Sequence, residues 1–353
     1  MRFDAVLEHL GFALLLAAVS AGLVRLMIAF PILDRPNARS AHSTPTPRGG
    51  GVGVVGAFVA GMLVLYHAAN YARIAEPQFV GVILAAVAIA AVSLADDVVN
   101  FRFVVKLAAQ CGAALVAMAS GLVVQRLAVP WLGVVDLGLL GPALTLFWIL
   151  ACTNAVNFMD GLDGLVGGSL LIACAVLCAI AALAGGWFVY AASLFLAAGL
   201  LGFLPFNWSP ARVFMGDVGS QFLGFVLAVL AVAAARFDVS QVSFLIVPLL
   251  LFALLFDSGF TLLRRAALGE RISTPHRTHL YQMAQRAGMR TRQVAALHAG
   301  FTAFQGGLAL LFLFLAPWAK PLVVVPALAV QLGWLLAVVR MVRRAGLSWR
   351  AGR

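Results

Sequence analysis

The sequence predicts an all-α polytopic membrane protein of about eleven transmembrane helices, on the basis of its composition and the spacing of its apolar segments. Of its 353 residues, 63% are hydrophobic and only 10% are charged, whereas about a quarter of a soluble globular chain is charged. Apolar windows of the roughly 20 residues that a bilayer crossing needs follow one another along the chain. The composition therefore excludes a cytosolic enzyme, a disordered protein and a nucleic-acid-binding domain.

The predicted spans lie near residues 9–33, 51–70, 79–95, 103–124, 137–154, 162–184, 187–205, 219–236, 243–263, 294–316 and 321–342. The first continues past Arg25 without a clear small-residue cleavage site, so we interpret it as a span and not as a signal peptide. Residues 1–353 are predicted to form a single integral membrane domain. The four cysteines lie in apolar surroundings without a metal-binding spacing and are interpreted as core residues.

The distribution of basic residues predicts the orientation in the membrane. One set of loops holds 18 of the 24 Lys and Arg residues. This set comprises 34–50, 96–106, 205–218, 264–293 and the tail from 343, with Arg340 at its edge. Cytoplasmic loops carry the excess of Lys and Arg, so this set is predicted to be cytoplasmic, with the N-terminus outside and the C-terminus inside. The same rule explains the net charge of +11 without a nucleic-acid partner.

Five of the 13 acidic residues lie directly against apolar runs on the predicted cytoplasmic side: Asp96, Asp97, Asp160, Asp163 and Asp217. Carboxylates at a membrane boundary are costly unless they have a partner or a function. Hard cations such as Mg²⁺ take oxygen ligands, usually one or two carboxylates together with substrate phosphate. The five aspartates therefore suggest a shared site for a divalent cation.

The pair Asp96 and Asp97 ends the third predicted span. Adjacent carboxylates repel each other, and a cation or a basic neighbour such as Arg102 or Lys106 would relieve the repulsion. A solvated helix end is the alternative explanation of this pair.

Four polar residues recur at every third position in the segment 154–165: Asn154, Asn157, Asp160 and Asp163. In a regular α-helix neighbouring members of this series share a face, whereas the first and the last point in opposite directions. Two glycines in the segment would allow a broken turn that directs all four side chains inward. The alternative is a purely structural role, but amides and carboxylates between two apolar helices are hard to explain by packing.

Asp217 lies in a Gly-Asp-x-Gly-Ser turn at the start of the predicted span 219–236. The free amides of a helix N-terminus bind phosphate, so this turn, with Gly219 and Ser220, is a candidate phosphate cradle. An aspartate that caps the helix is the alternative. Phe214 is either a membrane-interface aromatic or a platform on which a base stacks.

Two further loops lie on the predicted cytoplasmic side. Loop 264–293 contains His276, His279 and seven arginines, and arginine pairs well with phosphate oxygens. The positive-inside rule explains most of these arginines, and the two histidines alone do not make a metal site. Loop 34–53 contains a glycine-rich run after a basic residue, which fits either a phosphate-binding loop or a flexible connection.

Together these motifs resemble the polyprenyl-phosphate N-acetylhexosamine-1-phosphate transferase superfamily in type, order and spacing. The resemblance covers about residues 31–316 and rests on Asp96-Asp97, on 154–165, on the Phe-Met-Gly-Asp-x-Gly-Ser segment 214–220 and on the loop near His279. The superfamily includes the phospho-MurNAc-pentapeptide transferases of peptidoglycan synthesis. It also includes the UDP-GlcNAc:undecaprenyl-phosphate transferases that start O-antigen and related glycans.

The resemblance implies a role for each motif. Asp96, Asp97 and Asp217 are the expected catalytic residues, with the first two orienting or deprotonating the lipid phosphate. Asp217 is also the expected ligand of Mg²⁺, or of Mn²⁺ as a substitute, with Asn157 close by. The expected substrate-binding residues are Asp163 and Asn207 near the uridine, Phe214 on the uracil, Arg277 and His279 over the sugar and pyrophosphate, and Asn154 and Asp160 elsewhere in the site.

The histidine loop favours one branch of the superfamily. Pentapeptide transferases carry adjacent histidines and GlcNAc-type enzymes carry His-x-His-His. This chain has His276-Arg277-Thr278-His279, followed by Tyr281 and Gln282. Such a sequence resembles the branch that initiates O-antigen chains, including enzymes that use UDP-FucNAc or UDP-QuiNAc. The pentapeptide transferase reaction is the alternative within the superfamily.

The expected reaction moves a sugar-1-phosphate from a UDP-N-acetylhexosamine to undecaprenyl phosphate and releases UMP. Both reactants are anionic, so Mg²⁺ and arginine have to neutralise charge. A site on the cytoplasmic face of a bacterial inner membrane would meet the nucleotide sugar and the lipid together, and family precedent suggests a homodimer. A cation-coupled transporter is the alternative from another class, and it predicts acidic residues near mid-span and inverted repeats. The clustered aspartates instead lie at one face of the membrane, and no repeat is visible.

Overall fold

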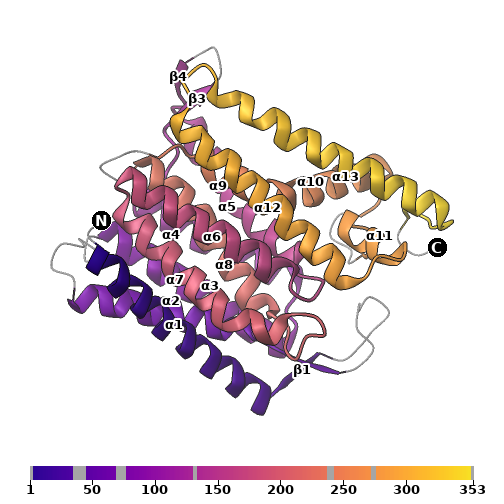
Figure 1. Cartoon of the computed structure of the whole chain (residues 1–353), viewed down its shortest axis with the longest axis horizontal. Helices are drawn as coiled ribbons and strands as arrows, with labels where there is room; N and C mark the ends of the chain where they lie inside the picture. Colours follow the sequence, from indigo (N-terminus) through magenta and orange to yellow (C-terminus); the bar gives the residue numbers. More distant parts are fainter. Residues whose placement is uncertain are drawn as a thin grey trace.

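The computed structural model describes residues 3–34, 45–68, 77–129, 133–236, 242–271 and 276–350 as a bundle of long helices (Figure 1). The helices are α1 (Phe3–Ala29), α2 (Gly51–Ala68), α3 (Pro77–Val99), α4 (Phe103–Ala119), α5 (Leu140–Met159), α6 (Leu165–Ala184), α7 (Trp187–Asn207), α8 (Gly216–Arg236), α9 (Ile246–Leu250), α10 (Phe252–Ala267), α11 (Leu280–Arg286), α12 (Thr291–Phe314) and α13 (Val324–Arg344), with a 3₁₀ turn at Lys320–Val323. Two short antiparallel hairpins pair β1 (Ile32–Asp34) with β2 (Thr46–Arg48) and β3 (Arg126–Val129) with β4 (Gly133–Asp136).

The helical, multi-span class predicted from the sequence is confirmed. Eight helices in the described part of the chain are long and apolar enough to cross a membrane, namely those within α1, α3, α5, α6, α7, α8 and α12 and the segment Lys320–Arg344. Helices α2 and α4 are shorter and equally apolar. A segment in lipid has to satisfy its backbone hydrogen bonds internally, and this is why apolar runs of this length form helices.

The predicted span at 243–263 differs from a simple crossing. It consists of the five-residue helix α9 and of α10, which are separated at Leu251. Helix α10 buries a polar face that lipid would not solvate, formed by Asp257, Ser258, Thr261 and Arg265. This segment therefore carries buried polar contacts, which its hydropathy did not reveal.

The ends of the bundle separate the two predicted sets of loops. Figure 1 shows the N-terminus and the β3–β4 hairpin at one end and the C-terminus, β1 and α11 at the other. This grouping agrees with the alternation of loops read from the basic residues. Which end faces the cytoplasm stays a prediction.

Helix α8 lies at the centre of the bundle, and nearly all of its apolar window is buried. It packs against α3 and α5, and its first turn touches the first turn of α2. A Cβ on Gly51 would lie 2.3 Å from the Cα of Gly219, so these two backbones approach each other too closely for a side chain. The contact fixes the N-terminus of α8, where Asp217 lies.

Gly219→Ala is expected to destabilise the protein, because its Cβ would lie 2.7 Å from the Cα of Gly51 and 2.4 Å from the Cγ of Met215. Overpacking of this kind costs about 1–3 kcal/mol. The matched control is Gly112→Ala in α4, where a Cβ meets nothing within 4 Å. Thermal unfolding in detergent measures both variants, and equal midpoints for the two would contradict the interpretation of this contact.

Candidate functional site

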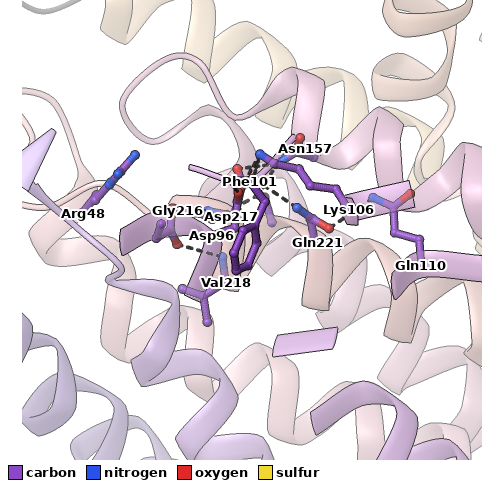
Figure 2. A network of polar contacts seen from close by, with 12 residues as sticks. Arg48, Asp96, Phe101, Lys106, Gln110, Asn157, Gly216, Asp217, Val218 and Gln221 are labelled. Carbon is purple, nitrogen blue, oxygen red and sulfur yellow. Dashed lines mark hydrogen bonds and ion pairs between the residues drawn. The ribbon is translucent and has the colours of Figure 1, made fainter. Parts of the chain in front are cut away.

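The ends of four helices bring together a network of polar side chains. Helix α3 contributes Asp96 and Asp97, α4 contributes Lys106 and Gln110, α5 contributes Asn154 and Asn157, and α8 contributes Asp217, Ser220 and Gln221. Figure 2 shows most of this network. Three of the four sequence motifs that carried the resemblance therefore meet directly in space, although they lie far apart in the chain.

Lys106 is the centre of this network. Its Nζ forms an ion pair with Asp96 and donates a hydrogen bond of 2.8 Å to Oδ2 of Asp217. The Asp96 side chain is buried, whereas 30% of the Lys106 side chain and 24% of the Asp217 side chain remain exposed. One ammonium thus joins two carboxylates at an opening to solvent.

Asp217 has further partners around it. Asn157 Nδ2 donates to its Oδ1 at 2.9 Å and to Ser220 Oγ at 2.9 Å, and Gln221 Nε2 donates to its Oδ2 at 3.1 Å. From Gln221 the network continues to Gln110 at 3.1 Å and then to Asn154 at 2.7 Å. Asn154 therefore supports the site through Gln110.

Asp97 has a different position from its neighbour. Its Oδ1 accepts the backbone N–H of Asp217 and its Oδ2 accepts that of Val218, both at 3.1 Å. These are orphan amides of the first turn of α8, which have no partner within the helix. Asp97 is thus a cap supplied by another helix, and it holds the main chain of Asp217 and of the residue after it in place.

Local backbone geometry explains these positions. Gly216 has φ of +76°, and a Cβ there would lie 2.7 Å from Oδ2 of Asp97, so the turn before Asp217 requires glycine. Asn100 adopts φ of +56° where α3 ends. The N–H of Phe101 then donates to Oδ1 of Asp96 at 2.6 Å, and this turn leads into α4 so that Lys106 faces back to Asp96.

The uridine-side residues of the prediction lie in a second, adjoining group. Asp163 accepts the N–H of Ala211 at 3.1 Å. The amide of buried Asn207 accepts from Gly164 N at 3.0 Å and donates to Val213 O at 3.0 Å. These bonds join the α5–α6 turn to the loop before α8. Both polar ends of the Asn207 amide are used by the main chain, so its contact with uridine stays a prediction.

Phe214 and the glycine-rich loop meet along their backbones. Phe214 N donates to Pro47 O at 2.8 Å, and its carbonyl accepts from Gly50 N at 2.9 Å. Gly51 N donates to Met215 O at 2.8 Å. The described part of loop 34–53 therefore forms one wall of the site, while its residues 35–44 lie outside the described residues.

The histidine loop lies beside the end of α5 and the α5–α6 turn. The ring centroid of His279 lies 6.1 Å from that of Phe158 and 4.9 Å from that of His276. The carbonyl of Arg277 accepts from Arg286 at 3.3 Å. The structure therefore places the main chain of the predicted loop beside 154–165, and the contacts of Arg277 and His279 with substrate stay predictions.

Negative charge exceeds positive charge at this site. Burial raises the pKa of Asp160 to about 8, and the charges of Asp217, Asp97 and Asp163 add to this effect. No three His, Cys, Asp or Glu side chains in the described part of the chain form a ready metal centre. The side chains of Asp217 and Asn157 nevertheless carry hard oxygen atoms, and their position among several carboxyl groups fits a cation completed by substrate phosphate.

Lys106, Gln110 and Gln221 were not predicted as site residues. The sequence indicated Lys106 in part, because it predicted that either a cation or a basic neighbour, Arg102 or Lys106, would relieve the repulsion between Asp96 and Asp97. The two glutamines lie within apolar helices, and their spacing alone did not separate them from ordinary polar residues.

Comparisons with known proteins identify the family of this chain. Glycosyl transferase family 4 matches residues 79–235, the segment from α3 to α8 that holds the Lys106 network. A probable undecaprenyl-phosphate N-acetylglucosaminyl 1-phosphate transferase from Bacillus subtilis is 32% identical over 271 residues, which is 76% of this chain and 74% of the relative. A decaprenyl-phosphate N-acetylglucosaminephosphotransferase from Mycobacterium tuberculosis is 32% identical over 309 residues, covering 78% and 75%.

This protein is thus a multi-span membrane protein with carboxylates clustered at its helix ends. The family match makes it a transferase of the glycosyl transferase family 4 type. The chain belongs to the polyprenyl-phosphate N-acetylhexosamine-1-phosphate transferase superfamily, on the branch of the prenyl-phosphate N-acetylglucosamine-1-phosphate transferases. The resemblance predicted from the sequence is therefore confirmed. A phospho-N-acetylmuramoyl-pentapeptide-transferase from Lactobacillus gasseri is also similar, at 34% identity over 53% of this chain and 50% of that protein.

Asp97→Asn is expected to destabilise the protein by about 1–3 kcal/mol, because an amide leaves one of the two α8 N–H groups without an acceptor. The matched control is Asp136→Asn, an exposed turn carboxylate that accepts the single N–H of Gly138. Its cost should stay within about 0.5 kcal/mol. Denaturation in detergent compares the two, and an unchanged midpoint for Asp97→Asn would refute its role as a cap.

Proposed function

We propose that this protein transfers N-acetylhexosamine-1-phosphate from a UDP-N-acetylhexosamine to undecaprenyl phosphate and releases UMP. The observation that carries the proposal is the ion-paired group of Asp96, Lys106 and Asp217 at the partly open ends of α3, α4 and α8. The names of its relatives, which act on polyprenyl phosphates, support the acceptor. We place the site on the cytoplasmic face of a bacterial inner membrane, in the first step of O-antigen or related envelope glycan synthesis.

The reaction is a phosphoryl transfer between two anions. An oxygen of the lipid phosphate attacks the β-phosphorus of the nucleotide sugar, and the bond from that phosphorus to the bridging oxygen of UMP breaks. The lipid diphosphate sugar and UMP are the products. Such a reaction depends mainly on positioning and on stabilisation of charge. Direct attack is the route that we propose, and a two-step route through a phospho-aspartyl intermediate is the alternative.

The contacts distinguish the two adjacent aspartates. Both oxygens of Asp97 accept main-chain N–H groups, so this residue holds Asp217 in position. Asp96 pairs with the partly exposed Lys106. We therefore assign to Asp96 the orientation or deprotonation of the lipid phosphate, and to Lys106 the neutralisation of charge where the two substrates meet.

Asp217 and Asn157 are the residues that would hold Mg²⁺, with Mn²⁺ as a substitute. When bound, the cation would stabilise negative charge on the diphosphate and on the leaving UMP. For the remaining substrate contacts we retain the residues given by the motifs: Asp163, Asn207 and Phe214 at the uridine, Arg277 and His279 at the sugar and pyrophosphate, and Asn154 and Asp160 lining the site.

The direct test is UMP release by the purified protein with undecaprenyl phosphate and Mg²⁺. UDP-GlcNAc, UDP-FucNAc, UDP-QuiNAc and UDP-MurNAc-pentapeptide are supplied separately, because a pentapeptide transferase is among the relatives. One UDP-N-acetylhexosamine should yield UMP only when lipid and Mg²⁺ are present, and Asp217→Asn should abolish the signal. UMP from UDP-MurNAc-pentapeptide alone would favour the pentapeptide transferase reaction of peptidoglycan synthesis. No UMP from any donor would contradict the proposal.

Lys106→Met is expected to lower kcat/KM by about 10²–10³-fold, the effect of removing one preorganised charge partner from a transition state. The matched control is Lys320→Met, which removes the only other lysine of the chain. Lys320 contacts the Phe312 ring at 5.1 Å outside the site, and its loss should leave turnover unchanged. Equal losses in the two variants would mean that Lys106 has no specific role.

A further inference from the structure

A buried carboxylate outside the Lys106 network holds the start of the helix that follows the histidine loop. Asp257 of α10 is only 1% exposed. Its Oδ1 lies 3.1 Å from Nδ1 of His279 and accepts the N–H of Leu280 at 2.9 Å, and its Oδ2 accepts the N–H of Tyr281 at 2.9 Å. Thr261 Oγ1, one turn further along α10, contacts Oδ1 at 3.3 Å.

These contacts span two elements that are otherwise separated by a loop. The carboxylate belongs to α10, whereas three of its four partners belong to consecutive residues at the start of α11. Loss of these hydrogen bonds would leave a buried carboxylate or buried N–H groups unpaired, which lowers the free energy of unfolding. Asp257 therefore determines where the first turn of α11 lies relative to α10.

The same turn contacts the α5–α6 segment of the site. Tyr281 Oη donates to Phe158 O at 3.0 Å. A Cβ on Gly161 would lie 2.2 Å from Tyr281 Oη, so the tyrosine hydroxyl lies this close to the main chain because residue 161 is glycine. The position of His279 relative to Asp160 and Asp163 is thereby fixed from both sides.

The carboxylate also selects the state of the imidazole ring. An Nδ1–H that donates to a carboxylate leaves Nε2 as the ring nitrogen available to another group, and such partners fix both the tautomer and the ring orientation. A histidine that is to meet a pyrophosphate or a sugar needs this orientation before the substrate arrives.

We propose that Asp257 is a positioning residue of the transfer reaction, because its carboxylate fixes the orientation of His279 and the start of α11. Asp257 itself touches no reacting atom in this arrangement and acts through His279. The effect of Asp257 on the transfer reaction rests on the proposed function. Its structural effect, on the position of His279 and of the start of α11, does not depend on that function.

The structural half is tested by hydrogen exchange in the full-length protein without substrate. In Asp257→Asn, the amides of Leu280 and Tyr281 should exchange roughly tenfold faster or more, since one of them loses its acceptor. Thr261→Val is the matched control, because it removes a contact to the same carboxylate and leaves the three contacts to α11 intact. Its exchange at residues 279–283 should equal that of the wild type. Unchanged exchange in Asp257→Asn would overturn the proposal.

The kinetic half is tested by a double-mutant cycle on UMP release. Asp257→Asn should lower kcat/KM by about 10–100-fold, the range known for carboxylates that orient a metal-binding histidine, where the same Nδ1–H contact is lost. Thr261→Val should be near wild type. In the background of His279→Gln, Asp257→Asn should have little further effect, because its contribution passes through the missing ring. Additive losses would overturn the proposal, since a general loss of folding would affect both backgrounds equally.

Two further measurements distinguish failure of the Asp257 proposal from misfolding of the variant and from failure of the proposed function. If Asp257→Asn does not fold, Asp257→Glu replaces it in the cycle, since it retains two acceptor oxygens on a side chain longer by one methylene. It should show the same non-additivity with His279→Gln. If the wild type releases no UMP from any donor, the proposed function fails, and the exchange result alone then supports or overturns the role of Asp257 in holding α11.

Discussion

The shared ammonium of Lys106 is the interaction on which the site depends. Asp96 and Asp217 come from helices that are more than a hundred residues apart in the chain, and their carboxylates would repel each other without a positive charge between them. Lys106 lies one turn into α4, and the turn at Asn100 and Phe101 directs it back to the end of α3. The geometry of three helix ends therefore follows from the need to neutralise two carboxylates near a low-dielectric core.

Asp97 and Asp257 make the same kind of contact in two parts of the protein. Asp97 accepts the N–H groups of Asp217 and Val218, and Asp257 accepts those of Leu280 and Tyr281. In each case one helix supplies a carboxylate to two consecutive amides at the start of another helix. The negative charge is stabilised by the positive end of that helix, and the residue at the helix start is held in position. Because a carboxylate contacts both amides at once, it fixes the direction of the second helix as well as its distance from the first.

The sequence predicted the helical membrane class and the motifs of the site, because apolar length and misplaced carboxylates are local signals. It also predicted that either a cation or a basic neighbour would relieve the repulsion between Asp96 and Asp97. It did not separate the two aspartates, since only the arrival of α8 beside α3 shows that Asp97 is occupied by main-chain amides. Asp257 was missed for a related reason: one aspartate inside an apparent span has no distinctive spacing, and its partners follow more than twenty residues later.

The division of 243–263 into α9 and α10 shows the same limit. Hydropathy averaged over the window favours a single crossing, whereas the buried polar face of α10 becomes visible only when its neighbours are known. Likewise, the amide of Asn207 matches a uridine-side position in the motif, yet the structure uses both of its ends to join two loops. Motif identity thus indicated a candidate site, while the contacts among its residues required the packing of helices.

The most direct test of the central assignment is an experimental structure with UDP-GlcNAc and Mn²⁺, in which anomalous scattering locates the metal. The metal should lie against Asp217 and Asn157, with the diphosphate next to Lys106 and the uracil near Phe214. A nucleotide and metal bound elsewhere, with the Lys106 network unchanged and distant from both, would contradict the assignment of this network as the site of transfer.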